Sequence, residues 1–200
     1  MGNSIDKVCT GLYVGGIMGA SKKELLLENN ITHVLAVLDN AEPHFPENFQ
    51  YKCIKISDSP SCDLSVHFKE SVDFIHKCRI EGGSCYVHCA AGISRSVTLC
   101  TVYLMTATTL SYEDAMTVMV YARSMAGPNF GFRMQMMKYT KTILNDERKR
   151  LKSEFPDNKL NDEQELGDLL KAAKEKFAKE GRPLTLRDHD EEAYIDPEKV

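Results

Sequence analysis

One cysteine and one arginine in this chain stand where a thiol could attack a bound anion. Cys89 and Arg95 are separated by five small or uncharged residues, Ala90, Ala91, Gly92, Ile93 and Ser94. A loop of this length can curl until its backbone N–H groups surround an anion. A helix expected over residues 97–106 would add the positive end of its dipole. The spacing therefore predicts that a thiolate at Cys89 attacks a phosphoryl group held by the planar fork of Arg95.

The Cys-x5-Arg spacing occurs at only one of the seven cysteines of the chain. Taken alone, such a pair could also be a buried cysteine near a surface arginine. Cys89 differs from the other cysteines because it follows a strand-like segment, residues 84–87, and precedes an apolar helical segment. A glycine, Gly92, also lies inside the loop. These features favour the catalytic interpretation of the pair.

The run His88-Cys89-x-Ala91-Gly92-x-Ser94-Arg95-Ser96 resembles the active-site loop of the dual-specificity protein phosphatases. The resemblance covers about residues 5–145 and includes the segments 11–15, 31–35, 58–60, 67–71 and 128–132. Together with Met1-Gly2-Asn3, the chain is similar to the small atypical, N-myristoylated branch that includes the JNK-stimulatory phosphatase.

This resemblance implies a hydrolase that acts on phosphotyrosine and on phosphoserine or phosphothreonine through a cysteinyl-phosphate intermediate. Its partners would be phosphoprotein substrates in signalling, with MAP kinase pathways among them, and neither a cofactor nor a metal would be needed. Two alternatives remain open. The chain could be a catalytically weak module that binds phosphoproteins, or a phosphatase of a non-protein substrate such as a phosphoinositide. The absence of lysine from residues 90–94 disfavours the inositide alternative.

A general acid must protonate the leaving oxygen, and Asp58 is the candidate. The tripeptide Asp-Ser-Pro is also common in turns, so the residues alone do not decide whether Asp58 is a turn residue or the general acid. The resemblance implies the acid. A carboxyl that faces a thiolate would tend to keep its proton, because like charges disfavour ionisation. Asp63 is the nearest competitor, and Asp39 is interpreted as a turn residue.

Three further residues have supporting roles in this interpretation. Ser96 would donate a hydrogen bond to the thiolate when the sulfur leaves, or it would cap the helix. His88 would order the loop, either as a structural histidine or as one that tunes the thiol. By resemblance, Asn129 would brace the loop, with a helix cap beside Pro128 as the alternative.

Composition limits the setting of this chemistry. The chain has 200 residues, of which 42% are hydrophobic, enough for one domain with a core. Seven cysteines without paired spacing indicate a reducing compartment and neither disulfides nor a metal site. A net charge of −4 gives no general affinity for nucleic acid. The longest apolar stretches are too short and too interrupted to span a bilayer. We therefore expect a cytoplasmic monomer.

Strand-like and helical segments alternate along the chain. Residues 7–14, 33–37, 51–56 and 84–88 are rich in β-branched or aromatic residues, which predicts four strands. Helices are expected at four places: residues 65–80, the segment 97–105, which is apolar nearly all round, after a capping box at Ser111, and after Pro128 with Phe132, Met136, Tyr139 and Ile143 on one face. The alternation predicts an α/β fold: a single domain whose central mixed sheet has helices on both faces. The anion loop would lie at the carboxyl end of a strand.

The C-terminal part of the chain is polar. We expect a catalytic domain over residues 1–150 and a charged tail over 151–200. The tail contains one amphipathic helix at about 162–180, which opens at the box Asp162-x-x-Glu165. Its apolar stripe consists of Leu166, Leu169, Leu170, Ala173 and Phe177. The sequence leaves open whether this helix docks on the domain or on a partner. Residues 187–200 are expected to be disordered.

The first residues, Met1 to Asp6, resemble an N-myristoylation site with Gly2 as the acceptor. Asp6 stands where serine or threonine is preferred. A single acyl chain gives only weak, reversible affinity for membranes. We therefore expect the protein to lie partly at the inner face of the plasma membrane, and a nuclear location is left open.

Overall fold

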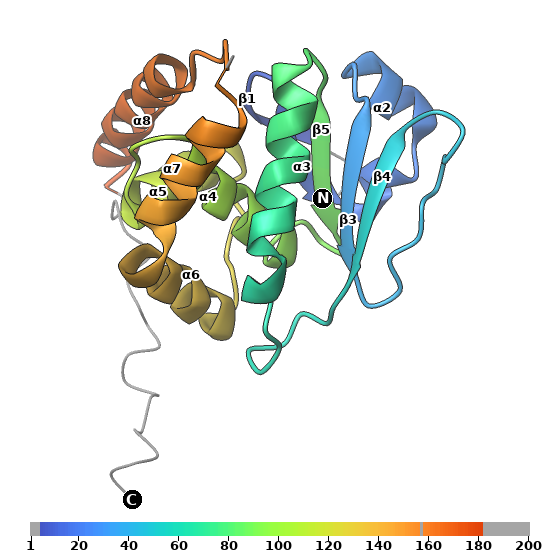
Figure 1. The fold of residues 1–200 in the computed structure, drawn as a ribbon, viewed down its shortest axis with the longest axis horizontal. Coiled ribbons are helices and arrows are strands. Elements are labelled where there is room, and N and C mark those ends of the chain that lie inside the picture. Colours follow the sequence, from blue (N-terminus) through green and yellow to red (C-terminus); the bar gives the residue numbers. More distant parts are fainter. Residues whose placement is uncertain (1–4, 157, 182–200) are drawn as a thin grey trace, which may run out of the picture.

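The computed structural model describes residues 5–156 and 158–181. Five strands form one mixed sheet in the spatial order β1-β2-β5-β3-β4 (Figure 1). The strands are β1 (Ile5–Cys9), β2 (Leu12–Gly16), β3 (His33–Leu38), β4 (Gln50–Lys55) and β5 (Cys85–Cys89). β1 is antiparallel to β2, and the other three pairings are parallel. β5 therefore lies at the centre of the sheet.

The segment expected as one strand over residues 7–14 is a hairpin of β1 and β2, so that prediction was wrong. The chain turns at Gly11, which has φ +74°. A Cβ at Gly11 would lie 2.9 Å from the carbonyl oxygen of Gly83. Thr10 and Gly11 interrupt the apolar residues between Cys9 and Leu12, so the sequence carried a turn signal that the prediction of a single strand did not use. The other three expected strands agree with β3, β4 and β5 to within one residue at each end.

Helices cover both faces of the sheet, as the alternation predicted. On one face α3 (Phe68–Ile80), which follows the short 3-10 helix η1 (Ser65–His67), packs beside α4 (Arg95–Ala107). On the other face lie α1 (Ile17–Ala20) and α2 (Lys23–Glu28). Side chains of β5 alternate between these faces. Val87 joins the core that includes α3 and α4, whereas Tyr86 joins the cluster that includes Leu26 of α2.

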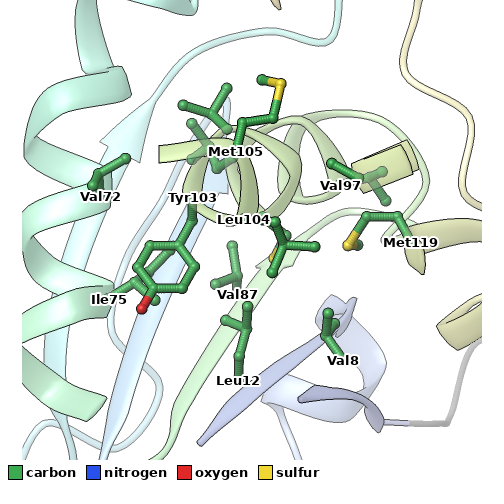
Figure 2. Close-up of a cluster of buried hydrophobic side chains, with 14 of the residues drawn as sticks. Val8, Leu12, Val72, Ile75, Val87, Val97, Tyr103, Leu104, Met105 and Met119 are labelled. Atoms are coloured by element: carbon green, nitrogen blue, oxygen red, sulfur yellow. The ribbon is translucent and has the colours of Figure 1, made fainter. Parts of the chain in front are cut away.

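α4 is the central element of the larger core. Every residue from Arg95 to Thr106 is buried, in agreement with a segment 97–105 that is apolar nearly all round. In Figure 2, Tyr103 and Leu104 of α4 lie among side chains of α3 and of the sheet, with Ile75 and Val87 beside them. A helix packed on all sides holds its first turn in a fixed position, and that turn carries Arg95.

Four helices complete the described part of the chain: α5 (Tyr112–Ala122), α6 (Phe130–Thr142), α7 (Leu144–Glu154) and α8 (Asp162–Lys179). Ser111 caps α5, since its Oγ accepts the N–H of Asp114 at 3.1 Å. Ile143 was expected on the apolar face of α6, but it follows the last residue of that helix and is half exposed. α7 was not predicted, because Leu144 and Leu151 are its only buried residues and give no clear period.

α8 docks on the catalytic domain, against α5 and β1. Asp162 forms a buried ion pair with Arg79 at 2.7 Å, and Glu165 accepts the backbone N–H of Thr10 at 2.8 Å. The expected capping box is therefore wrong: the N-cap residue is Asn161, and both acidic side chains make tertiary contacts instead. The apolar stripe is confirmed, and its members face the core or lie partly buried against it.

The division of the chain near residue 150 remains a prediction, and that residue lies within α7. Residues 187–200 lie outside the described part of the structure.

Candidate active site

The cysteine and arginine lie at the two ends of one loop. Cys89 is the last residue of β5, and Arg95 is the first residue of α4. The thiol is buried, with 1% of Cys89 exposed. Its Sγ accepts the N–H of Gly92 at 3.2 Å and lies 3.3 Å from Oγ of Ser96. The structure thus brings Cys89, Gly92, Arg95 and Ser96 together, as the spacing predicted.

The carbonyl groups of this loop are all held from outside it. The donors are His88 Nδ1 to Cys89 O (3.4 Å), Ile17 N to Ala90 O (3.1 Å), Arg123 Nη2 to Ala91 O (2.9 Å), Arg123 Nε to Gly92 O (2.5 Å), Gly127 N to Ile93 O (2.9 Å) and Thr98 N to Ser94 O (2.9 Å). In a trans peptide the C=O and the following N–H point in opposite directions. The N–H groups of residues 90–95 therefore face the inside of the loop, where that of Gly92 reaches the sulfur. Inward-facing N–H groups of this kind can bind an anion.

Gly92 is required by the way the loop packs against β2. Its φ is +70°, which only glycine adopts without strain. A Cβ at this position would lie 2.3 Å from the carbonyl carbon of Gly15. The glycine inside the loop therefore allows both the curl and the close approach of the neighbouring strand.

The guanidinium of Arg95 holds a buried donor, Nε, that makes no hydrogen bond to the described residues. Its side chain is 5% exposed, and its Nη1 donates to Asp39 Oδ2 and to the carbonyl of Ile56, each at 2.9 Å. Its Nε has no hydrogen-bond partner among the described residues and lies 3.6 Å from Asp58 Oδ2. A buried N–H donor without a partner is costly, so this atom is suited to an incoming oxygen.

Asp39 is a site residue that sequence reasoning missed. It was interpreted as a turn residue, and it does lie in the turn after β3, but its carboxylate also orients Arg95. A hydrogen bond from Ser57, followed by the contact with Arg95, lowers the pKa of Asp39. Its place after a strand parallel to β5 was the available signal, since the carboxyl ends of parallel strands meet at one edge.

Asp58 reaches the loop, and its competitor does not. Its Oδ1 accepts a hydrogen bond from Ser94 Oγ at 2.6 Å and one from Asn129 Nδ2 at 2.8 Å. Asp63 instead accepts the N–H of Ser65 at 3.0 Å, at the start of η1. The surroundings of Asp58 differ from those expected, because a positive charge, the guanidinium of Arg95, lies 3.6 Å from its Oδ2. Since Oδ1 is an acceptor twice, Oδ2 is the oxygen that can carry a proton.

Asn129 caps a helix, and its other contacts reach Asp58 and the loop. Its Oδ1 accepts the N–H of Phe132 at 3.0 Å and so caps α6. Its Nδ2 holds Asp58, and its backbone N–H donates to Ser94 Oγ at 3.1 Å. One side chain therefore fixes the start of a helix and braces the candidate acid against the loop.

His88 is a neutral side chain in the core of the site. Burial lowers its pKa to about 4, and its ring stacks on Tyr86 with centroids 5.6 Å apart. A neutral imidazole adds no positive charge near the thiol. The geometry therefore favours the structural alternative for His88, in which the ring supports the carbonyl of Cys89.

Arg123 is a second arginine that sequence reasoning missed, and no spacing or motif in the chain pointed to it. It follows α5 and binds two carbonyl groups of the loop.

Gly2 lies outside the described residues. Residues 5–156 and 158–181 contain no group of three histidine, cysteine or acidic side chains arranged to hold a metal ion. No helix within these ranges is long and apolar enough to cross a bilayer.

Comparison with known proteins agrees with this geometry. The catalytic domain of dual specificity phosphatases matches residues 12–142. Human dual specificity protein phosphatase 22 is 45% identical over 172 residues, which are 86% of this chain and 93% of that protein. Mouse dual specificity protein phosphatase 15 is 38% identical, over 85% of this chain and 72% of that protein.

The crystal structure of DUSP15 superposes with a TM-score of 0.73 at 38% identity, covering 76% of this chain and 97% of that one. The matched residues contain the whole loop from Cys89 to Arg95 together with Asp39, Asp58 and Asn129. This chain therefore belongs to the dual specificity phosphatases.

Proposed function

We propose that this phosphatase hydrolyses phosphoprotein esters in two steps through Cys89. In the first step the thiolate forms a bond to phosphorus, the P–O ester bond breaks, and the leaving oxygen takes a proton from Asp58. In the second step a water oxygen attacks the phosphorus and the P–S bond breaks. The proton of that water returns to Asp58. The observation that carries the proposal is the sulfur of Cys89 inside a loop whose N–H groups face inward.

The positive field of the site comes from the chain itself. The loop amides and Arg95 would bind the three terminal oxygens of the phosphoryl group and stabilise the charge that develops in transfer. Ser96 Oγ, 3.3 Å from the sulfur, would donate to the thiolate when it leaves in the second step. These roles require neither a cofactor nor a metal.

The retained residues favour catalysis over binding alone. A module that only recognises phosphoproteins needs an anion site but has no use for a nucleophile or an acid. This chain holds Cys89, Arg95 and Asp58 around one loop. We propose phosphotyrosine and phosphoserine or phosphothreonine in signalling proteins, including those of MAP kinase pathways, as substrates. The side chains of residues 90–94 are uncharged and would give the extra phosphates of an inositide no partner.

The test combines turnover on several substrates with one variant. Wild-type protein is assayed on phosphotyrosyl and phosphothreonyl peptides and on phosphoinositides, with and without a chelator. We expect turnover of the peptides, no effect of the chelator, and competition by vanadate. Cys89→Ser should abolish turnover while phosphopeptide binding persists, because the loop amides and Arg95 remain. Binding that disappears together with activity would show that Cys89 is structural, and a preference for inositides would contradict the protein substrate.

We further propose that the protein is a cytoplasmic monomer that visits the inner face of the plasma membrane. The support is the Met1-Gly2-Asn3 start, with Gly2 as the acceptor of a myristoyl group. One myristoyl chain gives an association constant on the order of 10⁴ M⁻¹, so binding would be weak and reversible. Acylation would change where the enzyme acts and leave its chemistry unchanged.

A further inference from the structure

Arg123 is a buried cation behind the phosphate loop, and each of its three guanidinium nitrogens makes one contact there. Nε donates to Gly92 O at 2.5 Å, and Nη2 donates to Ala91 O at 2.9 Å. Nη1 pairs with Asp6 Oδ2 at 2.5 Å. Only 2% of the Arg123 side chain is exposed. Contacts at three nitrogens fix the plane of the guanidinium in space.

The two carbonyls that Arg123 holds belong to the middle of the loop. The C=O of Ala91 shares a peptide unit with the N–H of Gly92, and the C=O of Gly92 shares one with the N–H of Ile93. Fixing both carbonyls on the outside therefore turns both N–H groups toward the inside. That of Gly92 is 3.2 Å from the sulfur of Cys89. These two peptide units flank the residue at φ +70°, where glycine has the greatest freedom to rotate.

Asp6 orients and compensates Arg123 from a distant part of the chain. It lies in the edge strand β1, 117 residues away in the sequence, and 26% of its side chain is exposed. A buried guanidinium is costly unless a partner offsets its charge. The pair thus connects the N-terminal strand to the loop. Asp6 departs from the preferred myristoylation pattern, and its pairing with Arg123 gives this carboxylate a structural role in the fold.

We propose that Arg123, oriented by Asp6, is a positioning residue for phosphoryl binding. It sets the N–H groups of Gly92 and Ile93 toward the phosphoryl oxygens without touching the reacting atoms. This inference rests on the proposed function, because it concerns the same loop.

The experiment measures binding in the absence of chemistry. In a Cys89→Ser background, a phosphotyrosyl peptide is titrated against Arg123→Lys, Asp6→Asn and a control, Lys7→Gln. Lysine keeps the charge but cannot hold two carbonyls and Asp6 at once. Lys7 is an exposed neighbour of Asp6 on β1. Thermal unfolding of each variant defines a temperature at which all of them are folded.

We expect Arg123→Lys to weaken peptide binding roughly 10- to 100-fold, the usual effect of losing hydrogen bonds to a charged group. Asp6→Asn should weaken binding less, with Asp6→Glu restoring it, and Lys7→Gln should stay within about twofold of its parent. In amide spectra, the Gly92 and Ile93 signals should shift when peptide binds to the parent and shift less in Arg123→Lys.

Unchanged affinity and unchanged amide shifts in Arg123→Lys would overturn the inference and leave Arg123 as a packing residue. Should that variant not fold, Asp6→Asn decides by the same two measurements. Failure of the Cys89→Ser parent to bind the peptide would contradict the proposed function and, with it, this inference. If the Cys89→Ser parent binds the peptide and Arg123→Lys does not change its affinity, only this inference is contradicted.

Discussion

Asn129 Nδ2 lies 2.8 Å from Asp58 Oδ1, although the two residues are 71 positions apart in the sequence. The same asparagine caps α6 through its Oδ1. The start of a helix and the position of the candidate acid are therefore set by one side chain. The close packing of Gly131 in α6 against Pro60 adds to this link, since a Cβ at Gly131 would lie 2.0 Å from the Pro60 carbonyl oxygen.

Asn129→Ser should separate the two roles of this residue. Serine is a good N-cap, so the free energy of unfolding should change by less than about 1 kcal/mol. Serine cannot reach Asp58 as the longer amide does, so kcat should fall several-fold. Asn129→Ala, which loses both contacts, should lower stability as well. Chemical denaturation and steady-state kinetics on the same samples check this, and equal kcat in Asn129→Ser and wild type would argue against the brace.

Asp58→Ala should lower kcat by roughly 10²- to 10⁴-fold, the range for a positioned general acid. The loss should shrink for aryl phosphates with good leaving groups, because their oxygen needs little protonation. The matched control is Asp63→Ala, whose carboxylate lies at the start of η1. A loss in Asp58→Ala that is equal for good and poor leaving groups would assign the acid role elsewhere.

Two buried histidines should make the fold less stable in mild acid. Burial lowers the pKa of both His76 and His88 from 6.5 to about 4. As pH falls below 6.5 the unfolded chain binds protons that the folded chain does not, so the free energy of unfolding decreases until about pH 4.

His76→Gln should reduce this dependence, because it removes one of the two groups while a side chain remains near Tyr103. Urea denaturation compared between about pH 6 and 5 is the measurement, since most carboxylates stay ionised in that interval. An identical pH slope in His76→Gln and wild type would contradict the expected contribution of His76.

The ion pair between Arg79 and Asp162 should carry much of the docking of α8. Both side chains are almost fully buried, at 1% and 5% exposed. Asp162→Ala leaves the Arg79 charge without its carboxylate, which should cost about 3–5 kcal/mol of unfolding free energy. The control is Lys174→Ala, which breaks the partly exposed pair with Asp114 and should cost at most about 1 kcal/mol. Equal losses in the two variants would show that burial of this pair is unimportant.

Gly2→Ala should move the protein from membranes to the soluble fraction without changing activity on a soluble peptide. The reason is that the acyl group would add only membrane affinity. Intact mass of protein made in eukaryotic cells is the direct measurement. A free N-terminal glycine, or a retained Met1, would contradict the lipid anchor.

The sequence alone determined the parts of this site that are neighbours along the chain. Cys89, the loop and Arg95 are consecutive, so their spacing alone predicts an anion site. The flanking strand and helix followed from local hydrophobic patterns, and three of the four expected strands were correct to within one residue at each end. The hairpin at Gly11 was missed although Thr10 and Gly11 interrupt the apolar pattern there. Helix α7 was missed because its two buried residues give almost no apolar pattern to detect.

Tertiary structure decided everything that joins distant segments. Asp39 reaches Arg95 only because β3 pairs with β5 in parallel. Asn129 reaches Asp58 only because α6 packs against the segment after β4. Asp6 and Arg123 meet behind the loop across 117 residues. Such contacts leave no local pattern in the sequence, since a hydrogen bond between remote residues depends on the order of the strands and the packing of the helices.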